Sequence, residues 1–406
     1  MAIELIKGGV CAPVGFKAGS TLAGIKKGRT KNDLSLIYSK VKCNAAAVYT
    51  TNKVKGAPLT VTKNNLSDGK AQAVICNSGN ANTCNANGIE IATKTCNLLA
   101  KRIKIPASDI IVASTGVIGQ PMSIDPIEAA IPALVESLSE DGSAKAAEGI
   151  MTTDTALKEV SVSFVVGGKI CKMGGIAKGS GMIHPNMATM LVFITTDCAI
   201  SSEMLQKALS GYVQSTFNMV SVDGDTSTND MVCVLANGMA GNKEICGTGK
   251  DYKEFMKALN TVTVNLCRKI AADGEGATKL LECRVSGAKD EKNAKIIAKS
   301  VICSSLVKAA MFGEDANWGR ILCAIGYSGA EVDVSKIDVS FISSKGEIPV
   351  CSDGTGVDFS EDFAKEILGE DEITIEVKLE DGDSEAVAWG CDLTYDYVKI
   401  NGDYRT

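Results

Sequence analysis

Hydrophobic residues recur along this chain with two spacings, and each spacing predicts a type of element. Short apolar runs, several of them alternating with polar residues and rich in β-branched side chains, predict strands. Apolar residues repeated every three or four positions predict helices. The expected strands are 34–39, 45–51, 59–62, 71–76, 109–113, 160–166, 169–173, 190–196, 331–341, 373–379 and 386–392. The expected helices are 89–102, 125–138, 201–213, 252–270, 294–310 and 359–368.

Strands alternate with helices along the chain, and no dinucleotide-binding fingerprint accompanies them. This order favours a mixed α/β layered fold. With 406 residues, the chain exceeds the roughly 250–300 residues that one hydrophobic core usually supports. We therefore expect two substructures or one large multilayer fold.

Composition narrows the class of protein. Apolar residues make up 45% of the chain and charged residues 22%, as in ordinary soluble domains. The net charge of −6 and the lack of a basic stripe argue against a nucleic-acid-binding protein. Charged residues occur too early for a secretory leader, and no uninterrupted apolar run reaches about 18 residues. The sequence thus predicts a cytoplasmic protein without a membrane partner.

Cysteine and histidine usage excludes several kinds of site. The fifteen cysteines are dispersed, odd in number and without a Cys-x-x-Cys pair, which predicts reduced thiols packed as small core residues. His184 is the single histidine, so a zinc site built on several histidines is excluded. A loop position without a chemical role is the plainer interpretation of His184.

The most informative stretch is 178–193, which reads Lys-Gly-Ser-Gly-Met-Ile-His-Pro-Asn-Met-Ala-Thr-Met-Leu-Val-Phe. A Gly-rich lead ends at Pro185, and after Ala188 the residue Thr189 opens an apolar strand. This arrangement suits an N-terminal nucleophile, because attack of the Thr189 hydroxyl on the preceding carbonyl gives an ester whose hydrolysis frees an α-amine. The freed amine could then act as the base for its own hydroxyl. By spacing alone, an ordinary structural Ala-Thr pair at a strand start remains an alternative.

Other polar stretches have a plain interpretation beside a functional one. The loop 77–82 could line a pocket or only connect a strand to a helix. Thr115 and Gly116 follow a predicted strand and offer a hydroxyl and an unobstructed N–H, which suits an oxyanion, although Thr-Gly turns are common. The run 151–155 could be a capped turn, Lys178 a solvated charge and Glu275 an exposed turn residue. The acidic loop 223–230 lacks the spacing of an EF-hand, and we interpret it as a structured polar loop near the site.

Three motifs together change these interpretations: the run 178–193, Met-Thr-Thr-Asp-Thr at 151–155, and Asn-Gly-Asp-Tyr-Arg-Thr at 401–406. With them the chain closely resembles the ornithine acetyltransferases (glutamate N-acetyltransferases) of arginine biosynthesis over nearly its whole length. The resemblance implies a layered αββα sandwich, similar in outline to Ntn hydrolases but with its own connectivity. It also implies a smaller α/β portion at about 280–406, and cleavage into pieces 1–188 and 189–406 that assemble as a heterotetramer with two copies of each.

The resemblance also implies roles for individual residues. Thr189 would be the nucleophile and, through its freed amine, the base. Thr115 and Gly116 would form the oxyanion hole, and Ala188-Thr189 would be the cleaved bond. N-acetylornithine and glutamate would be the substrates, with no metal and no cofactor; whether acetyl-CoA also serves as an acetyl donor stays open. The implied substrate-binding residues are Thr152, Thr153, Lys178, Thr189, Glu275, Asn401 and Thr406, with the choice between the first two left open.

Two rival functions remain at this point. The nearer is a self-processing aminopeptidase or amidohydrolase with the same N-terminal nucleophile, which would release free acetate rather than transfer it. The more distant is a binding protein that never cleaves itself.

Overall fold

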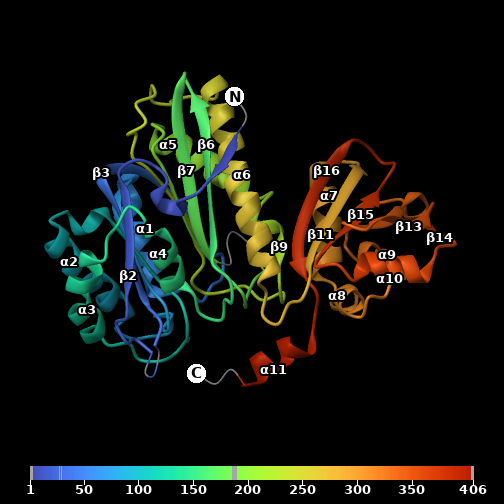
Figure 1. The fold of residues 1–406 in the computed structure, drawn as a ribbon, viewed down its shortest axis with the longest axis horizontal. Helices are drawn as coiled ribbons and strands as arrows, with labels where there is room; N and C mark the ends of the chain where they lie inside the picture. The colour runs from blue at the N-terminus through green and yellow to red at the C-terminus, as the bar shows by residue number, and fades with distance from the viewer. Residues whose placement is uncertain (1–2, 27, 29, 185–189, 404–406) are drawn as a thin grey trace. The chain divides into compact units, whose positions relative to one another are not determined.

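The computed structural model describes residues 3–26, 28, 30–184 and 190–403. The chain divides into two compact units, each drawn from several segments (Figure 1). Unit 1 comprises Met1–Gly179, Asn186–Gln214 and Thr226–Leu266. Unit 2 comprises Ser180–Pro185, Ser215–Asp225 and Cys267–Thr406, so the expected C-terminal portion at about 280–406 lies inside it.

Unit 1 is built on a mixed sheet in which, among the described residues, nine strands pair. The order is β1-β6-β7-β8-β10-β3-β4-β5, and β2 pairs with β3 beside this path. The strands are β1 (Glu4–Ile6), β2 (Phe16–Thr21), β3 (Leu34–Tyr49), β4 (Lys70–Asn77), β5 (Ile110–Ser114), β6 (Lys158–Val166), β7 (Lys169–Lys178), β8 (Leu191–Thr196) and β10 (Met231–Ala236). The helices are α1 (Ala57–Asn65), α2 (Gly88–Ile103), α3 (Asp125–Glu136), α4 (Ser143–Ile150), α5 (Ser202–Val213) and α6 (Lys250–Ala272), the last counted to unit 1 up to Leu266, with 3₁₀ turns η1 (Gly9–Cys11), η2 (Leu66–Asp68) and η3 (Ala107–Asp109).

The sheet of unit 1 folds back on itself at β3. The pairing of β3 with β4 shifts register between Tyr38 and Cys43, and beyond the shift β3 pairs with β10. One core cluster contains Val74 from β4 together with Phe193 from β8 and Cys233 from β10, so it fills the space between the two halves of the sheet. A second cluster packs the other face of β4 against α1, α2 and α3.

A helix also covers the outer face of the part of the sheet that contains β6, β7, β8 and β10. The Cα of Gly175 in β7 lies so close to Leu266 and Val262 of α6 that a side chain there would touch both. In Figure 1, α2 and α3 lie on the side of β2 that is turned away from α5 and α6. The layer sequence helix, sheet, sheet, helix follows, and the predicted α/β class is confirmed.

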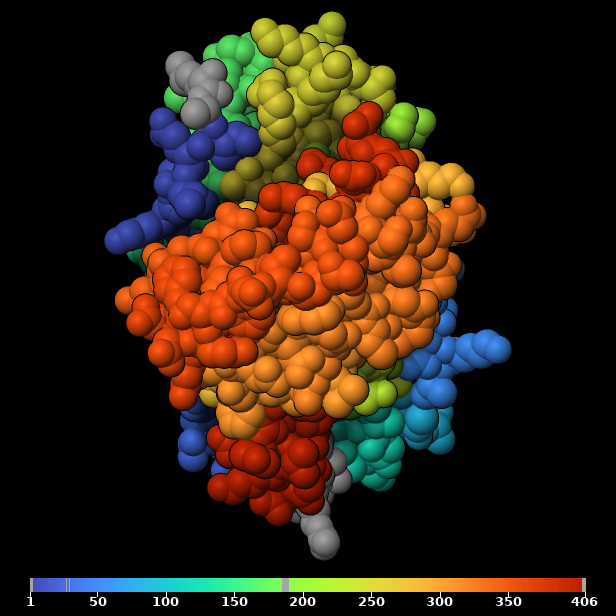
Figure 2. Space-filling model, turned by 90° about the vertical axis from the view of Figure 1, so that its right-hand side faces the viewer, coloured from blue at the N-terminus to red at the C-terminus, as the bar shows by residue number. Residues whose placement is uncertain are grey.

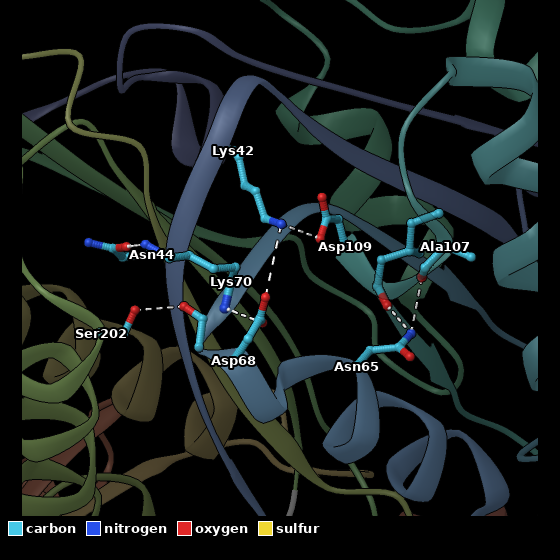
Figure 3. Close-up of polar contacts among 10 residues, drawn as sticks. Lys42, Asn44, Asn65, Asp68, Lys70, Ala107, Asp109 and Ser202 are labelled. Atoms are coloured by element: carbon cyan, nitrogen blue, oxygen red, sulfur yellow. Dashed lines mark hydrogen bonds and ion pairs between the residues drawn. The ribbon is translucent and has the colours of Figure 1, made fainter.

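Polar contacts fix the amino ends of β4 and β5 (Figure 3). The Lys42 ammonium lies 2.8 Å from the buried Asp109 carboxylate, directly before β5. The Asn65 amide donates to the carbonyls of Ala107 and Ile110, at 3.2 and 2.8 Å. Directly before β4, the Asp68 carboxylate accepts from the Lys70 N–H at 3.0 Å. Both strands therefore start from a fixed point, and they pair in parallel up to Asn77 and Ser114.

Unit 2 contains a seven-stranded sheet with the order β14-β13-β12-β15-β11-β16-β9 among its described residues. Its strands are β9 (Val220–Ser221), β11 (Leu280–Ala288), β12 (Asp338–Ser343), β13 (Gly346–Ser352), β14 (Thr355–Gly356), β15 (Glu372–Lys378) and β16 (Ser384–Cys391). Its helices are α7 (Glu291–Cys303), α8 (Ser305–Phe312), α9 (Trp318–Gly326), α10 (Glu361–Leu368) and α11 (Tyr395–Asp403), with 3₁₀ turns η4 (Phe217–Met219) and η5 (Val334–Lys336). The surface that this unit turns to the viewer in Figure 2 is mostly orange, the colour that the bar gives to residues around 300–350.

Most expected elements are present, and three predictions are wrong in type or in bounds. The run 59–62 is part of helix α1 rather than a strand, because Pro58 suits a first helical turn and the Thr62 hydroxyl finds the Val112 carbonyl at 2.7 Å. The single helix expected at 294–310 is two helices, since Ser304 ends α7 and its side chain accepts from the Val307 N–H to cap α8. The strand expected at 331–341 begins only at Asp338, after η5.

The cysteine prediction is confirmed: all fifteen thiols are free and most are buried. Within the described part of the chain, no helix combines the length and apolar character needed to cross a bilayer.

Candidate active site

The backbone turns sharply where β5 ends, at Ser114, Thr115 and Gly116. The Thr115 N–H donates to the Asn77 carbonyl at 2.9 Å, and Gly116 follows with φ +126°. A Cβ at Gly116 would overlap the backbone of Gly79 and Asn80. Only glycine combines this φ with this close approach.

Two hydrogen-bond donors at this turn are left open. Among the described residues, neither the Thr115 hydroxyl nor the Gly116 N–H has a hydrogen-bond partner, whereas the neighbouring N–H groups of Thr115 and Val117 both do. Thr115 is only 9% exposed. A hydroxyl and an N–H that are adjacent, unpaired and largely desolvated are the groups that an oxyanion hole requires.

A buried network of amide side chains holds the turn in place. The Ser114 hydroxyl donates to Asn77 Oδ1 at 2.5 Å, and Asn77 Nδ2 donates to the Asn80 carbonyl at 2.9 Å. Asn229, which comes just before β10, donates to the carbonyls of Ala81 and Ser114 at 2.5 and 2.8 Å. The loop 77–82 thus fixes the turn from behind, and no described contact shows it lining a pocket.

Lys178 lies at the carboxyl end of β7 among buried acidic groups. The Asp154 carboxylate accepts from the Lys158 ammonium at 2.7 Å and from the Gly179 N–H at 2.8 Å, and both partners of the ion pair are buried. Burial alone would raise the pKa of Asp154, but the ammonium groups of Lys178 and Lys158 lower it to about 2. Lys178 itself is 9% exposed, and no described residue accepts a hydrogen bond from its ammonium. A buried ammonium with free donors is suited to binding a carboxylate.

Asp230 is a second buried acid beside this lysine. Oδ2 of Asp230 is the one buried side-chain polar atom in the described part of the chain that lacks a hydrogen-bond partner. Burial raises the pKa of Asp230 well above its ordinary range, despite contacts with Ser227 and Thr50 and the nearby Lys178. The Met231 N–H donates to the Met190 carbonyl at 2.9 Å. Asp230 therefore lies beside Met190, at the amino end of β8. In the sequence, Met190 directly follows the proposed nucleophile Thr189.

Unit 2 brings together Glu275 and Asn401. Asn401 Nδ2 in α11 donates to Glu275 Oε2 at 2.9 Å, in the turn that leaves α6. Gly181 lies under the Glu275 carboxylate, where a Cβ would overlap it. The Thr394 hydroxyl donates to the Gly276 carbonyl at 2.6 Å, which ties the start of α11 to the same turn.

His184 is held neutral in unit 2. Its Nδ1 lies 3.1 Å from the Ser221 hydroxyl and 3.6 Å from the Cys303 thiol. Burial and the Lys299 ammonium lower the pKa of His184 to about 4. His184 therefore stays uncharged at neutral pH. Its described neighbours, Ser221 in β9 and Cys303 at the end of α7, are not among the predicted site residues.

The structure places the remaining predicted residues as follows. Thr152 and Thr153 follow α4 and are half-buried, and the Thr152 N–H donates to Asp154 Oδ2 at 3.0 Å, so the choice between the two hydroxyls stays open. Ala188, Thr189 and Thr406 lie outside the described residues. Unit 1 thus contains Thr115 and Gly116 at the end of β5 and brings Lys178 close to Asp154 of the 152–154 turn, and unit 2 pairs Glu275 with Asn401.

Sequence reasoning did not single out Asp154, Asn229 or Asp230. Asp154 was visible within the motif 151–155, yet the hydroxyls there drew the functional interpretation. Asn229 and Asp230 belong to the loop 223–230, which the sequence predicts to be a structured polar loop near the site without assigning a role to either residue. What distinguishes these residues is burial and long-range pairing, which no local spacing reveals.

A cavity of about 450 Å³ in unit 2 contains none of the predicted site residues. Arg268, Glu282, Glu372 and Arg284 lie in its wall and pair with one another. In the ranges that the structure describes, no group of three or more His, Cys, Asp or Glu side chains could hold a metal ion.

A family model described as the ArgJ family matches residues 17–406 of this chain. The chain is 51% identical over 405 residues to the arginine biosynthesis bifunctional protein ArgJ of Caldanaerobacter subterraneus subsp. tengcongensis, covering 100% of both chains. It is 48% identical over 406 residues to the protein of the same name from Listeria monocytogenes, again covering 100% of both.

Among solved structures, the chain is similar to the arginine biosynthesis bifunctional protein argJ of Bacillus halodurans. The two are 48% identical with a TM-score of 0.50, and the match covers 98% of the solved chain but 52% of this one.

Proposed function

Because this chain belongs to the ArgJ family, we propose that it is an acetyltransferase of arginine biosynthesis that moves an acetyl group from N-acetylornithine to glutamate. The printed names of its relatives support the pathway, and the word "bifunctional" supports acetyl-CoA as a second acetyl donor. The structural observation that carries the proposal is the pair of unpaired donors at Thr115 and Gly116.

The proposed reaction begins with self-cleavage. The Thr189 hydroxyl attacks the Ala188 carbonyl, the peptide nitrogen leaves as the α-amine of Thr189, and water hydrolyses the resulting ester. This yields pieces 1–188 and 189–406. After the cut, Thr189 carries both the hydroxyl that acts as nucleophile and the α-amine that acts as its base.

Acetyl transfer follows in two halves. The Thr189 hydroxyl attacks the acetyl carbonyl of N-acetylornithine, its proton passes to the amine, and ornithine leaves. The amino group of glutamate then takes the acetyl group from the threonine ester. An α-amine with a reference pKa of about 7.7–8.0 can move these protons near neutral pH without a histidine.

We assign the remaining roles by charge. The Thr115 hydroxyl and Gly116 N–H stabilise the oxyanion of each tetrahedral intermediate. The unpaired Lys178 ammonium binds a substrate carboxylate, with a hydroxyl of Thr152 or Thr153 beside it. Glu275 binds a substrate amine, and Asn401 and Thr406 complete the set of substrate contacts.

The coverage of the solved relative supports cleavage into two pieces. The proposed second piece has 218 of 406 residues, or about 54% of the chain. The Bacillus halodurans chain is matched almost completely and covers a similar share, 52%. A two-by-two assembly of the pieces remains part of the proposal.

The intact mass of the purified protein under denaturing conditions tests the first step. We expect two pieces, the second beginning at Thr189, and an uncut chain for Thr189→Ala. Thr189→Ser should keep part of both cleavage and transfer, since it retains the hydroxyl. Cleavage of the alanine variant would sink the assignment of the nucleophile.

An assay with N-acetylornithine tests the second step. Acetyl transfer to glutamate should outpace release of free acetate. Release of acetate at an equal or higher rate would instead indicate an amidohydrolase with the same nucleophile.

A further inference from the structure

The segment that precedes the proposed cut is built into unit 2. Residues 180–185 belong to that unit, although Gly179 before them and Asn186 after them belong to unit 1. The Ser180 hydroxyl donates to the Asp273 carbonyl at 2.8 Å, and the Ser180 carbonyl accepts from the Glu275 N–H at 3.1 Å. These two bonds fix the start of the segment.

One carboxylate fixes its middle. Asp223 Oδ2 accepts from the Met182 N–H at 2.7 Å, and Asp223 Oδ1 accepts from the Ile183 N–H at 2.9 Å. The Ile183 carbonyl in turn accepts from the Val222 N–H at 2.7 Å. Asp223 thus clamps two consecutive amides with its two oxygens.

The clamped backbone has a conformation that the free chain would rarely adopt. Met182 has φ +51°, in the left-handed region that residues with a Cβ disfavour. Since the strained residue and the clamp coincide, the Asp223 carboxylate selects one conformation for the chain that leads to residue 185.

We propose that Asp223 is a positioning residue for self-cleavage. This inference rests on the proposed cut at Ala188-Thr189. Attack of a hydroxyl on a neighbouring carbonyl needs a well-ordered approach, and small misplacements of reacting groups cost up to about 100-fold in rate. By fixing Met182 and Ile183, Asp223 sets where the chain enters the reacting segment.

Asp197 offers a matched control. Its carboxylate accepts from the N–H groups of Lys172 and Val14 at 2.7 and 2.9 Å. Asp197 is buried, with 1% of its surface exposed. It directly follows β8, at the end of that strand opposite to Met190. Burial raises the pKa of both Asp197 and Asp223. Asp197 thus accepts from two backbone amides as Asp223 does, but beside the carboxyl end of β8 rather than in the segment before the proposed cut, and it is more deeply buried than the half-buried Asp223.

The experiment follows cleavage of the newly made full chain, by cell-free synthesis with samples quenched in denaturant and resolved by mass. In Asp223→Asn one oxygen becomes an amide that can no longer accept, so one of the two N–H groups loses its partner. We expect cleavage to slow by about 10- to 100-fold. Asp197→Asn should lower thermal stability to a similar degree and leave the cleavage rate within about twofold.

A second variant keeps the inference testable should Asp223→Asn fail to fold. Ser180→Ala removes a single hydroxyl bond from the same segment and should slow cleavage several-fold in a folded chain. Cleavage at the wild-type rate in folded Asp223→Asn, or in folded Ser180→Ala where the first variant does not fold, would overturn the inference, as would equal slowing by Asp197→Asn.

These outcomes are separate from failure of the proposed function. An uncut wild-type chain, or cleavage of Thr189→Ala, would disprove the cut itself. A cut that depends on Thr189 but not on Asp223 would remove only the positioning role.

Discussion

At the scale of single residues, the described part of the chain leaves a few polar groups without hydrogen-bond partners while nearly all its other buried side-chain polar atoms are paired. The Gly116 N–H and Thr115 hydroxyl are open because the amide network of Asn77 and Asn229 consumes the carbonyls around them. Lys178 has free donors because Asp154 is already bonded to Lys158 and to backbone amides. Unpaired groups in a desolvated place cost stability, so their retention points to a use in binding or catalysis.

The hydroxyl of Thr115 can be tested by a change that keeps its shape. Thr115→Val retains the branched side chain but removes the O–H, and we expect kcat to fall about 10²- to 10³-fold, the usual cost of one oxyanion donor. Thr115→Ser restores a hydroxyl and should recover most of the loss. Steady-state transfer assays on processed enzyme would show this, and equal rates for the valine variant and wild type would contradict the role.

The buried Asp154–Lys158 pair predicts a pH-dependent contribution to stability. Asp154→Asn removes the carboxylate from the buried ion pair with Lys158 and should cost about 3–5 kcal/mol in the free energy of unfolding. Because the folded pKa of Asp154 is about 2, below its ordinary 3.8, this contribution is present above pH 3.8 and is lost as the pH falls toward 2. Urea unfolding at several pH values should show the two proteins converging in acid.

Asp230 should show the opposite sign. Its folded pKa is raised above 3.8, so the folded state holds a proton that the unfolded state has released. Stability is therefore lost as the pH rises from 3.8 through the raised pKa. Asp230→Asn removes this loss, and its thermal midpoint relative to wild type should increase with pH. A difference that is constant from pH 4 to 8 would contradict the burial argument.

At the scale of elements, local pattern accounts for most of the fold. The periodicity of 252–270 predicts helix α6, and the strands expected at 160–166 and 169–173 are β6 and β7, which pair antiparallel. The pattern misled at 59–62, where β-branched residues suggested a strand although Pro58 begins a helix. It also missed the break at Ser304, because the apolar stripe continues across it. The turn at Thr115 and Gly116 could be singled out from sequence, whereas the bend in β3 and the burial of Asp154 and Asp230 depend on contacts between distant segments.

Two glycines predict contrasting effects in elements of unit 1. Gly211 lies exposed inside α5 with open space around its Cα, so Gly211→Ala should stabilise the protein by about 0.5–1 kcal/mol. Gly174 in β7 lies against the Gly9 carbonyl, and Gly174→Ala must push η1 away at a cost of about 1–3 kcal/mol. Chemical denaturation of both variants checks the pair; a stabilising Gly174→Ala would show that η1 moves freely.

At the scale of the whole molecule, the proposed pieces are interleaved within one sheet. Strands β8 and β10 come from the second piece, yet they lie between β7 and β3 of the first. β8 pairs with β7 along Leu191–Thr196, and β10 pairs with β3 along Met231–Ala236. Neither piece therefore holds the whole of the nine-stranded sheet, and the core between its halves draws residues from both pieces.

This arrangement predicts that cleavage does not release the pieces. After processing they should co-elute in native gel filtration at every protein concentration tested and separate only in denaturant. The physical reason is that separation would expose both long edges of β8–β10 and the core beneath them. Elution of free pieces from a native column would show that the interleaving is lost after the cut.

The insertion of β8 and β10 between strands of the other piece also bears on gene dosage. Two proteins that complete each other's sheet in this way are needed in equal amounts, since any surplus of one would carry open strand edges and an uncovered core. A single reading frame delivers them one to one in every ribosomal pass. With the proposed cut, one gene for both halves would control their stoichiometry, and expression of the two halves from separate messages should leave whichever is in excess aggregated.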